Sequence, residues 1–490
     1  MVVCRSLLKL FAFGLLVPVS GCGQLAESTR KKNTEKPNVV FIMVDDLGWS
    51  DLGYMGSNYY ETPNIARLAG NGMVFTNAYA GAANCAPSRA ALMSGMSAPR
   101  TGVYTVSPSD RGNAKSRKLI PIENTDFIND SVYTLAEMFK DAGYVTGHFG
   151  KWHIGEDPGT QGFDVNIGGG RWGHPKSYFA PYVYPEIEAP EGEYLTDRIT
   201  GEAITFIENN KNNPFFLYLP FYTVHTPIQG KQAIVEKYRQ KAGNNNHNRP
   251  DYAAMIETMD FNVGRVLDKL DELELSNTLL VFTSDNGGIF AVSKQTPLRA
   301  GKGSYYEGGI RVPLIVRWPG MISHRITDVP VVHLDFFPTF KDIIGADIPG
   351  NQPMDGTSLK NLLIDGEELD ERPIFFHFPV YLQAYSKTSG CNRDPLFRTR
   401  PGTSVRYGDW KLLHFYEDDD YELYNLKTDS GEKENLVNEH PGKADELKIL
   451  MDNWCEETNA PIPNQLNPDF DSHWNQEQIS KYRTELNDLP

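Results

Sequence analysis

Short apolar runs alternate with amphipathic helical patterns along most of this chain, and this alternation constrains its fold more than any other feature. It is typical of a mostly parallel β-sheet with helices on both faces. Buried strands are predicted at residues 39–44, 144–148, 215–220, 279–283 and 312–317. Helices are predicted from Pro63, with the Thr62 hydroxyl as cap, to Gly70, and at 131–142 and 251–273.

The pattern changes near residue 372, beyond which short antiparallel strands are predicted at 375–378, 410–413 and 421–424. A helix at 443–456 and a polar tail follow them. A chain of 490 residues with 40% hydrophobic content can bury a large core. We therefore expect an α/β fold, with a large, mostly parallel sheet sandwiched by helices over 37–371. A smaller α+β domain on a short antiparallel sheet is expected over 372–490.

The first 22 residues have the composition of an export signal, with a positively charged start, an apolar run at 10–17 and a small-residue end. The apolar run is too short to span a bilayer as a helix. Val19-Ser20-Gly21-Cys22 resembles a bacterial lipobox, which predicts lipidation of Cys22. A cleaved signal peptide with an incidental cysteine is the alternative. Either predicts a protein of the periplasm or cell surface, with a polar linker over 23–36.

The charge balance of 63 acidic and 47 basic residues excludes a broad electrostatic grip on nucleic acid or on an anionic bilayer. Any anionic substrate must therefore meet a local cluster of positive groups. The five cysteines include Cys4 and Cys22 in the signal, so no disulfide framework is expected. A single bridge between Cys391 and Cys455 stays open.

Polar side chains follow four of the predicted strands, at the point where each strand ends. In an open α/β sheet the binding crevice lies at the carboxyl ends of the strands, so these side chains are expected to converge. They are Asp45 and Asp46, Lys151 and His153, His225, and Asp285 with Asn286. The four oxygen donors Asp45, Asp46, Asp285 and Asn286 suit Ca²⁺, or Mg²⁺, better than zinc. Turn or helix-cap chemistry is the alternative for either pair alone.

The segment from Cys85 to Gly95 is the strongest signal in the sequence. Pro87 is typical of a first helical turn, residues 90–93 continue the helix, and Gly95 ends it. Free amides at a helix start favour an anion, and Arg89 adds a full positive charge. A lone cysteine is often only a small buried apolar side chain. Its setting here predicts the position of a nucleophile.

The order Cys85-x-Pro87-Ser88-Arg89, followed by Leu92 and Ser94-Gly95, resembles the signature of the formylglycine-dependent sulfatases, of the alkaline phosphatase superfamily. Further resemblances follow in family order along the chain. They are Val44-Asp45-Asp46-Leu47-Gly48, Thr62-Pro63-Asn64, Gly150-Lys151-Trp152-His153, His225-Thr226-Pro227, Ser284-Asp285-Asn286-Gly287-Gly288, Leu298-Arg299-Ala300-Gly301-Lys302-Gly303 and Glu307-Gly308-Gly309-Ile310-Arg311. Residues 421–426 resemble an element of the family's C-terminal domain.

The resemblance implies that Cys85 is oxidised to formylglycine by a formylglycine-generating or sulfatase-maturing enzyme. Its hydrate would attack sulfur beside a divalent ion held by Asp45, Asp46, Asp285, Asn286 and the modified Cys85. Arg89 and Lys151 would stabilise the hydrate, and His153 would handle its proton during elimination. His225 and Lys302 would bind the sulfate and assist departure of the alcohol, one of them as acid.

Two loops are candidates for contacting a sulfated glycan. Trp172 and His174 lie in a glycine-rich segment suited to a sugar ring, and residues 381–400 carry Arg398 among several cations. Ordinary surface loops are the alternative. A phosphonate or phosphodiester hydrolase is the second enzymatic interpretation, and a catalytically dead glycan-binding protein is the third hypothesis.

Overall fold

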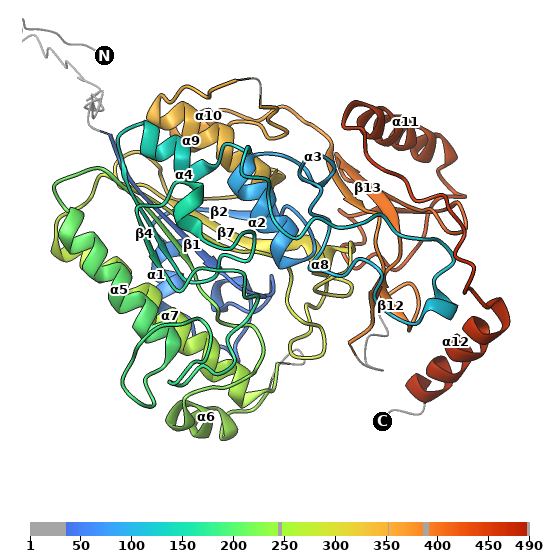
Figure 1. Cartoon of the computed structure of the whole chain (residues 1–490), viewed down its shortest axis with the longest axis horizontal. Coiled ribbons are helices and arrows are strands. Elements are labelled where there is room, and N and C mark those ends of the chain that lie inside the picture. The colour runs from blue at the N-terminus through green and yellow to red at the C-terminus, as the bar shows by residue number, and fades with distance from the viewer. Residues whose placement is uncertain (1–35, 244–246, 351, 386–391, 488–490) are drawn as a thin grey trace, which may run out of the picture. The chain divides into compact units, whose positions relative to one another are not determined.

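The computed structural model describes residues 36–243, 247–350, 352–385 and 392–487, and its centre is a mixed β-sheet (Figure 1). The first five strands of the spatial order are parallel to their neighbours, whereas β7 runs antiparallel to both β6 and β2. The order is β4 (Val165–Ile167), β3 (Val145–Phe149), β5 (Phe215–Pro220), β1 (Asn38–Val44), β6 (Thr278–Ser284), β7 (Arg311–Arg317), β2 (Met73–Tyr79) and β8 (Arg325–Thr327), with β9 (Val331–Val332) pairing β2. The expected large, mostly parallel sheet is confirmed.

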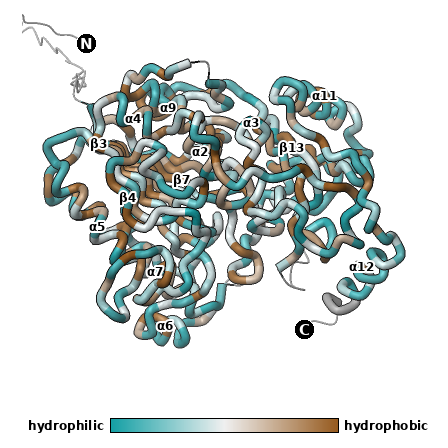
Figure 2. Tube along the Cα trace, in the orientation of Figure 1, coloured by the Kyte–Doolittle hydropathy of each residue, from teal (hydrophilic) through white to brown (hydrophobic). Residues whose placement is uncertain are grey.

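Helices cover both faces of this sheet, because alternate residues of its strands are apolar on both sides. Val40, Ile42 and Val44 of β1 pack on one helical layer, and Val39, Phe41 and Met43 pack on the other. The first layer contains α1 (Pro63–Ala69), α5 (Leu195–Asn210), α6 (Gln232–Arg239) and α7 (Pro250–Glu272). The second contains α2 (Cys85–Ser94), α4 (Leu135–Asp141), α9 (Phe336–Ile344) and α10 (Lys360–Ile364). Apolar segments accordingly gather along the central strands (Figure 2).

Two predicted helix starts differ from the structure. The helix expected at 131–142 begins only at Leu135, because Thr134 and Glu137 form a reciprocal capping box there. The helix beginning at Pro63 is present, but the Thr62 hydroxyl does not cap it. That hydroxyl instead accepts a hydrogen bond of 2.9 Å from the Gly53 amide. Both differences are local and leave the layers unchanged.

The C-terminal region contains the predicted antiparallel sheet, in the order β10 (Ile374–Phe378), β13 (Gly402–Tyr407), β14 (Trp410–Phe415) and β15 (Asp420–Asn425). Helix α11 (Pro441–Glu457) packs on one face through Leu447 and Met451. Strand β13 was not predicted, and the expected polar tail contains a further helix, α12 (Ser472–Asn487). A two-stranded element, β11 (Leu382–Gln383) with β12 (Phe397–Thr399), precedes the sheet's second strand. The domain boundary at 371 stays a prediction, since Pro37–Pro490 cluster as one compact unit.

A buried charge network joins the small sheet to the segment that follows the large one. Lys411 of β14 lies 3.0 Å from Glu307, at the start of α8 (Glu307–Ile310), and 2.8 Å from Glu432. Glu307 also accepts a hydrogen bond from the Tyr79 hydroxyl at 2.9 Å. Burial raises the pKa of Glu432 to about 7, although Lys411 acts against the shift. Lys411 thus lies between two carboxyl groups that are shut off from water, and Arg311 faces the second oxygen of Glu307 at 3.7 Å.

Replacing Lys411 by methionine is expected to lower the free energy of unfolding by about 3–5 kcal/mol, because Glu432 would stay buried without a cation and Glu307 would keep only Arg311, at 3.7 Å. The matched control is Lys427→Met, since Lys427 is mostly exposed and pairs with Asp409 at the surface. The control should lose no more than about 1 kcal/mol. Urea unfolding of the two variants checks this, and similar midpoints would contradict it.

Several predictions concern residues outside the described part of the chain. They include the signal at 1–22, the linker up to residue 35, and Cys391, so lipidation of Cys22 and the Cys391–Cys455 bridge stay predictions. Among the described residues, no helix has both the length and the apolar character needed to cross a bilayer.

Candidate active site

Four neighbouring parallel strands, β3, β5, β1 and β6, end at the same edge of the large sheet. Val44, the last residue of β1, lies opposite Ser284, the last residue of β6. Asp45-Asp46 and Asp285-Asn286 therefore leave the sheet side by side, and the Asp46 amide donates to Asp285 Oδ1 at 3.1 Å. The predicted convergence at the strand ends is thus present in the fold.

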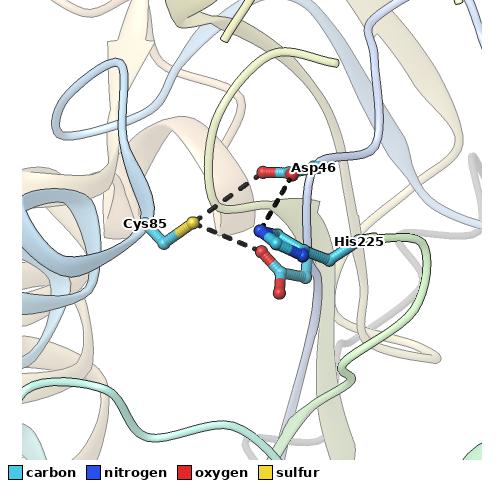
Figure 3. Close-up of side chains that lie close together, drawn as sticks. Asp46, Cys85 and His225 are labelled. Atoms are coloured by element: carbon cyan, nitrogen blue, oxygen red, sulfur yellow. Dashed lines mark hydrogen bonds and ion pairs between the residues drawn. The ribbon is translucent and has the colours of Figure 1, made fainter. Parts of the chain in front are cut away.

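Cys85 is the first residue of α2, which ends at Gly95 in the left-handed conformation with φ 68°. The whole helix is buried, and its start points the thiol at the strand ends. Cys85 Sγ lies 3.4 Å from Asp45 Oδ1, 3.8 Å from Asp46 Oδ1 and 3.0 Å from Lys302 Nζ. Figure 3 shows the thiol facing Asp46 and His225 from the opposite side of the site. The Cys85 side chain thus lies among charged groups rather than in an apolar pocket.

Three pairs of opposite charges line the site, and all six side chains are buried. Lys151 Nζ lies 2.7 Å from Asp45, and Lys302 Nζ lies 2.6 Å from Asp46. Arg89 donates from Nε and Nη2 to Asp285 Oδ2 at 2.9 and 2.7 Å. The formal charges of these side chains cancel. These six side chains together carry no net charge that would attract an anion, so a further positive charge would strengthen anion binding here.

The oxygen donors fit a divalent cation on three observations of the described residues. Asn286 Oδ1 is buried without a hydrogen-bond partner, while Nδ2 of the same amide donates to Asp46 and to the Gly287 carbonyl at 2.8 and 2.9 Å. Ligand atoms of Asp45, Asp46, Cys85 and His225 all lie within 4.8 Å of one another. Burial raises the pKa of Asp45 to about 7, against the pull of Lys151. An added cation would satisfy the orphaned amide oxygen and stabilise the ionised carboxylates.

Burial also controls the protonation of the remaining groups. It raises the pKa of the Cys85 thiol, despite the nearby charge of Lys151 and Lys302, so the encoded side chain is a neutral thiol. Burial and Lys302 lower the pKa of His225 to about 3. His225 Nδ1 lies 2.7 Å from the Thr226 carbonyl, which can only accept, so Nδ1 carries the proton and Nε2 faces Asp46 at 3.5 Å.

Two of the predicted site residues have left-handed backbone conformations although neither is glycine. Asp46 has φ 60° and His153 has φ 67°. Such conformations cost about 1–3 kcal/mol each and gather at functional sites. His153 follows Gly150, whose φ of 129° lets the chain pass the Pro220 carbonyl of β5, where a Cβ atom would approach to 2.0 Å. The His153 side chain is half-buried, and its buried Nδ1 has no hydrogen-bond partner among the described residues.

The glycine-rich loop that was predicted to contact a sugar lies over this end of the sheet. The Gly170 carbonyl accepts a hydrogen bond from the His153 amide at 2.9 Å. The His174 ring stacks on the His225 ring, with 5.6 Å between the ring centroids and 6° between the ring planes. The Trp172 ring stacks on Tyr184 at 6.3 Å. The loop therefore forms an aromatic wall beside His225.

The arginines of the second predicted loop, at 381–400, have different partners. Arg393 pairs with Asp420. Arg400 pairs with Asp394 and also with Glu417, whose carboxylate lies 2.6 Å from it. Only Arg398 reaches the site, where Nη1 donates to the Lys302 carbonyl at 3.2 Å. A second arginine near it, Arg111, was not predicted, because the polar segment around it contains no motif or periodic pattern.

Comparison with known proteins agrees with this geometry. Residues 37–346 match the model of the sulfatase family, and residues 301–457 match that of the N-sulphoglucosamine sulphohydrolase C-terminal region. A sulfatase from Formosa agariphila is 33% identical, with 92% of this chain and 94% of the relative covered. The N-acetylgalactosamine-6-sulfatase of Sus scrofa is 34% identical over 70% of this chain and 69% of its own length.

Among solved structures, the crystal structure of Ps i-CgsB in complex with k-i-k-neocarrahexaose has a TM-score of 0.72 and 29% identity, covering 92% of this chain and 99% of that one. The family match covers more than half of the chain and includes every residue placed at the strand ends. The chain belongs to the sulfatase family and is a sulfuric ester hydrolase.

Proposed function

We propose that this protein is an exported enzyme that removes sulfate esters from a sulfated carbohydrate. It would use a formylglycine derived from Cys85 and a divalent metal ion. The observation that carries the proposal is the position of the Cys85 side chain, within 3.0–3.8 Å of Lys302, Asp45 and Asp46. A cysteine with a purely structural role would lie among apolar side chains instead.

Asp45, Asp46, Asp285 and Asn286 would hold the ion, with the modified side chain of residue 85 completing the set. Their hard oxygens favour Ca²⁺, with Mg²⁺ as the alternative. When bound, the ion would supply the extra positive charge that the balanced side chains lack and would polarise the sulfate group.

The aldehyde matters because its hydrate has two hydroxyl groups: one attacks sulfur as the alcohol leaves, and deprotonation of the other expels sulfate by carbon–oxygen cleavage. The residues around it have distinct tasks. Arg89 and Lys151 would stabilise the hydrate, and His153, whose pKa is held well below its ordinary value by desolvation, would accept its proton. His225 and Lys302 would contact the sulfate, one of them protonating the leaving oxygen.

Lys302→Ala is expected to lower kcat by about 10²- to 10³-fold, because it removes one preorganised positive donor from the site. The control is Lys294→Ala, since Lys294 is an exposed lysine of the same loop and lies over the Phe290 ring. Steady-state sulfate release measures both. Near-normal turnover of Lys302→Ala would refute the assigned role, and a large loss in the control would show that the loop itself had changed.

The substrate is inferred from the aromatic wall and from the relatives. Trp172, Tyr184 and His174 offer ring faces and a polar edge beside His225, which suits a sugar. Two relatives carry the names N-acetylgalactosamine-6-sulfatase and N-acetylgalactosamine-6-O-sulfatase, from Sus scrofa and Bacteroides thetaiotaomicron. The solved relative described above is in complex with k-i-k-neocarrahexaose. Each favours a sulfated glycan over a small aryl sulfate.

Export rests on the N-terminal signal, and lipidation of Cys22 would tether the enzyme to a membrane. A maturation enzyme that oxidises Cys85 is then a required partner.

Peptide mass spectrometry of the mature protein tests the modification at position 85. Release of sulfate from a panel of sulfated oligosaccharides, with phosphate and phosphonate esters as competitors, tests the reaction. We expect the aldehyde at position 85 and preference for sulfate esters. Faster turnover of phosphorus esters would favour the hydrolase alternative, and an unmodified cysteine without turnover would favour a binding protein.

A further inference from the structure

Three segments that are distant in sequence lie side by side next to the candidate active site. The Arg111 amide donates to the Tyr381 carbonyl at 3.2 Å, just before β11, and Gln383 of β11 pairs with Phe397 of β12. A Cβ atom at Gly112 would lie 2.6 Å from the Phe397 ring. Arg111 and Arg398 are thereby brought to the same place, where the segment after α3 (Ala98–Thr101) runs past β12 (Figure 1).

Arg398 connects this place to the catalytic lysine. It is only 5% exposed, its Nε donates to the Gln383 carbonyl at 2.9 Å, and its Nη1 donates to the Lys302 carbonyl. Lys302 Nζ in turn lies 3.0 Å from Cys85 Sγ. The ring of Tyr385 lies 3.6 Å from the Arg398 guanidinium, on which it stacks.

Neither arginine has a carboxylate partner among the described residues. Within the described part of the chain, the Arg111 guanidinium donates only to the carbonyls of Val106 and Ser107, the latter at 2.9 Å. The nearby acidic side chains of the same segments form ion pairs with other arginines: Asp110 with Arg117, and Asp394 with Arg400. Burial and the charge of Arg398 lower the pKa of Arg111, and Tyr385 and Cys85 act against this shift. Arg398 is buried and Arg111 is half-buried, and guanidinium groups withdrawn from water are ordinarily paired, so this pair lacks an anion.

Beyond Tyr385 lies a cleft of about 410 Å³ with aromatic walls. Gly112, Tyr385 and Phe397 line one side, and Trp474 and Tyr482 of α12 line the other. The two arginines therefore lie between the nucleophile position and a groove that suits a further sugar ring.

From this arrangement we infer that Arg111 and Arg398 bind a second anionic group of the substrate, a sulfate or a carboxylate, on a sugar next to the one that is desulfated. The inference rests on the proposed function and narrows its substrate to a polyanionic oligosaccharide. Guanidinium groups bind both anions through paired hydrogen bonds.

The test compares three disaccharides with the same scissile sulfate ester: one with no other charge, one with a second sulfate on the neighbouring sugar, and one with a uronic acid there. The mature wild-type enzyme is expected to prefer one or both dianionic substrates by roughly 10- to 100-fold in kcat/KM. The two dianionic arms identify which anion is bound. Added salt should reduce the preference.

Arg111→Gln and Arg398→Gln should each reduce this preference, and the double variant should bring it near unity. The matched control is Arg393→Gln, a nearby arginine already paired with Asp420, which should keep the preference. The inference is overturned if the wild-type enzyme hydrolyses all three substrates equally, or if the double variant keeps the preference. In both cases the proposed function still stands. No release from any disaccharide would overturn the proposed function, and the inference with it.

Discussion

Cys85→Ala is expected to lower turnover by roughly 10⁴- to 10⁶-fold, as removal of a covalent nucleophile does in other hydrolases. Alanine offers neither a thiol to oxidise nor an oxygen to attack sulfur. It also fills less space than cysteine at a fully buried helix start, so stability should be measured beside activity. Sulfate release at saturating substrate checks the loss, and thermal unfolding checks that the variant is folded.

The control for this variant is Cys455→Ala. Cys455 is a half-buried thiol of α11 that packs on the small sheet, away from the strand ends. Its replacement should leave turnover within about 3-fold and cost stability only through lost packing. A second control is wild-type protein produced without the maturation enzyme. Burial keeps its Cys85 thiol protonated, so it should be as inactive as the alanine variant. Substantial activity of the Cys85→Ala variant, or of wild-type protein made without the maturation enzyme, would refute the proposed nucleophile.

Removal of divalent ions by a chelator is expected to lower activity by at least about 10³-fold, because a bound ion supplies several kcal/mol to such a reaction. Stability should respond too, which gives a measurement independent of turnover. At a free ion concentration 100 times Kd, the folded state should gain about 2.7 kcal/mol. Unfolding curves measured against Ca²⁺ and Mg²⁺ then identify the ion that this site prefers.

Two variants distinguish the loss of an ion ligand from the general effect of altering a buried polar side chain. Asn286→Ala removes the orphaned oxygen and should weaken the dependence of stability on the ion. Asp51→Asn alters another fully buried carboxylate, which accepts from Tyr252 at 2.7 Å and from Ser293 at 2.6 Å. It should destabilise the protein but keep its response to the ion. Unfolding curves that ignore both ions at every concentration would rule out the metal site.

Much of the site was predictable, because its signals are local. A buried strand is a short apolar run, and Asp45-Asp46 and Asp285-Asn286 come directly after two of them. The rule that parallel strands present their carboxyl ends at one edge then brings distant residues together without further information. The start and end of α2 were likewise indicated by Pro87 and Gly95.

Weak local patterns account for the misses in the fold. Strand β13 contains Gly402 and Arg406, and α12 is rich in polar residues, so neither has a strong periodic apolar signal. The antiparallel direction of β7 is also invisible in its apolar sequence, since a buried strand looks the same in either direction.

Charge pairing was decided only by the tertiary structure. In the sequence, Arg393, Arg398 and Arg400 are equivalent cations of one loop, and Arg111 belongs to no motif. Folding gives Arg393 and Arg400 carboxylate partners and leaves Arg398 beside Lys302 and Arg111. Residue type sets which groups carry charge and where strands end, whereas the partner of each charge depends on how the chain folds back on itself. Arg393 and Arg400 find carboxylates 6 to 27 residues away, and Arg398 is placed against Lys302, 96 residues away. For this reason the chemistry of the strand ends could be inferred from the chain alone, while the arginines that we assign to substrate selection could not.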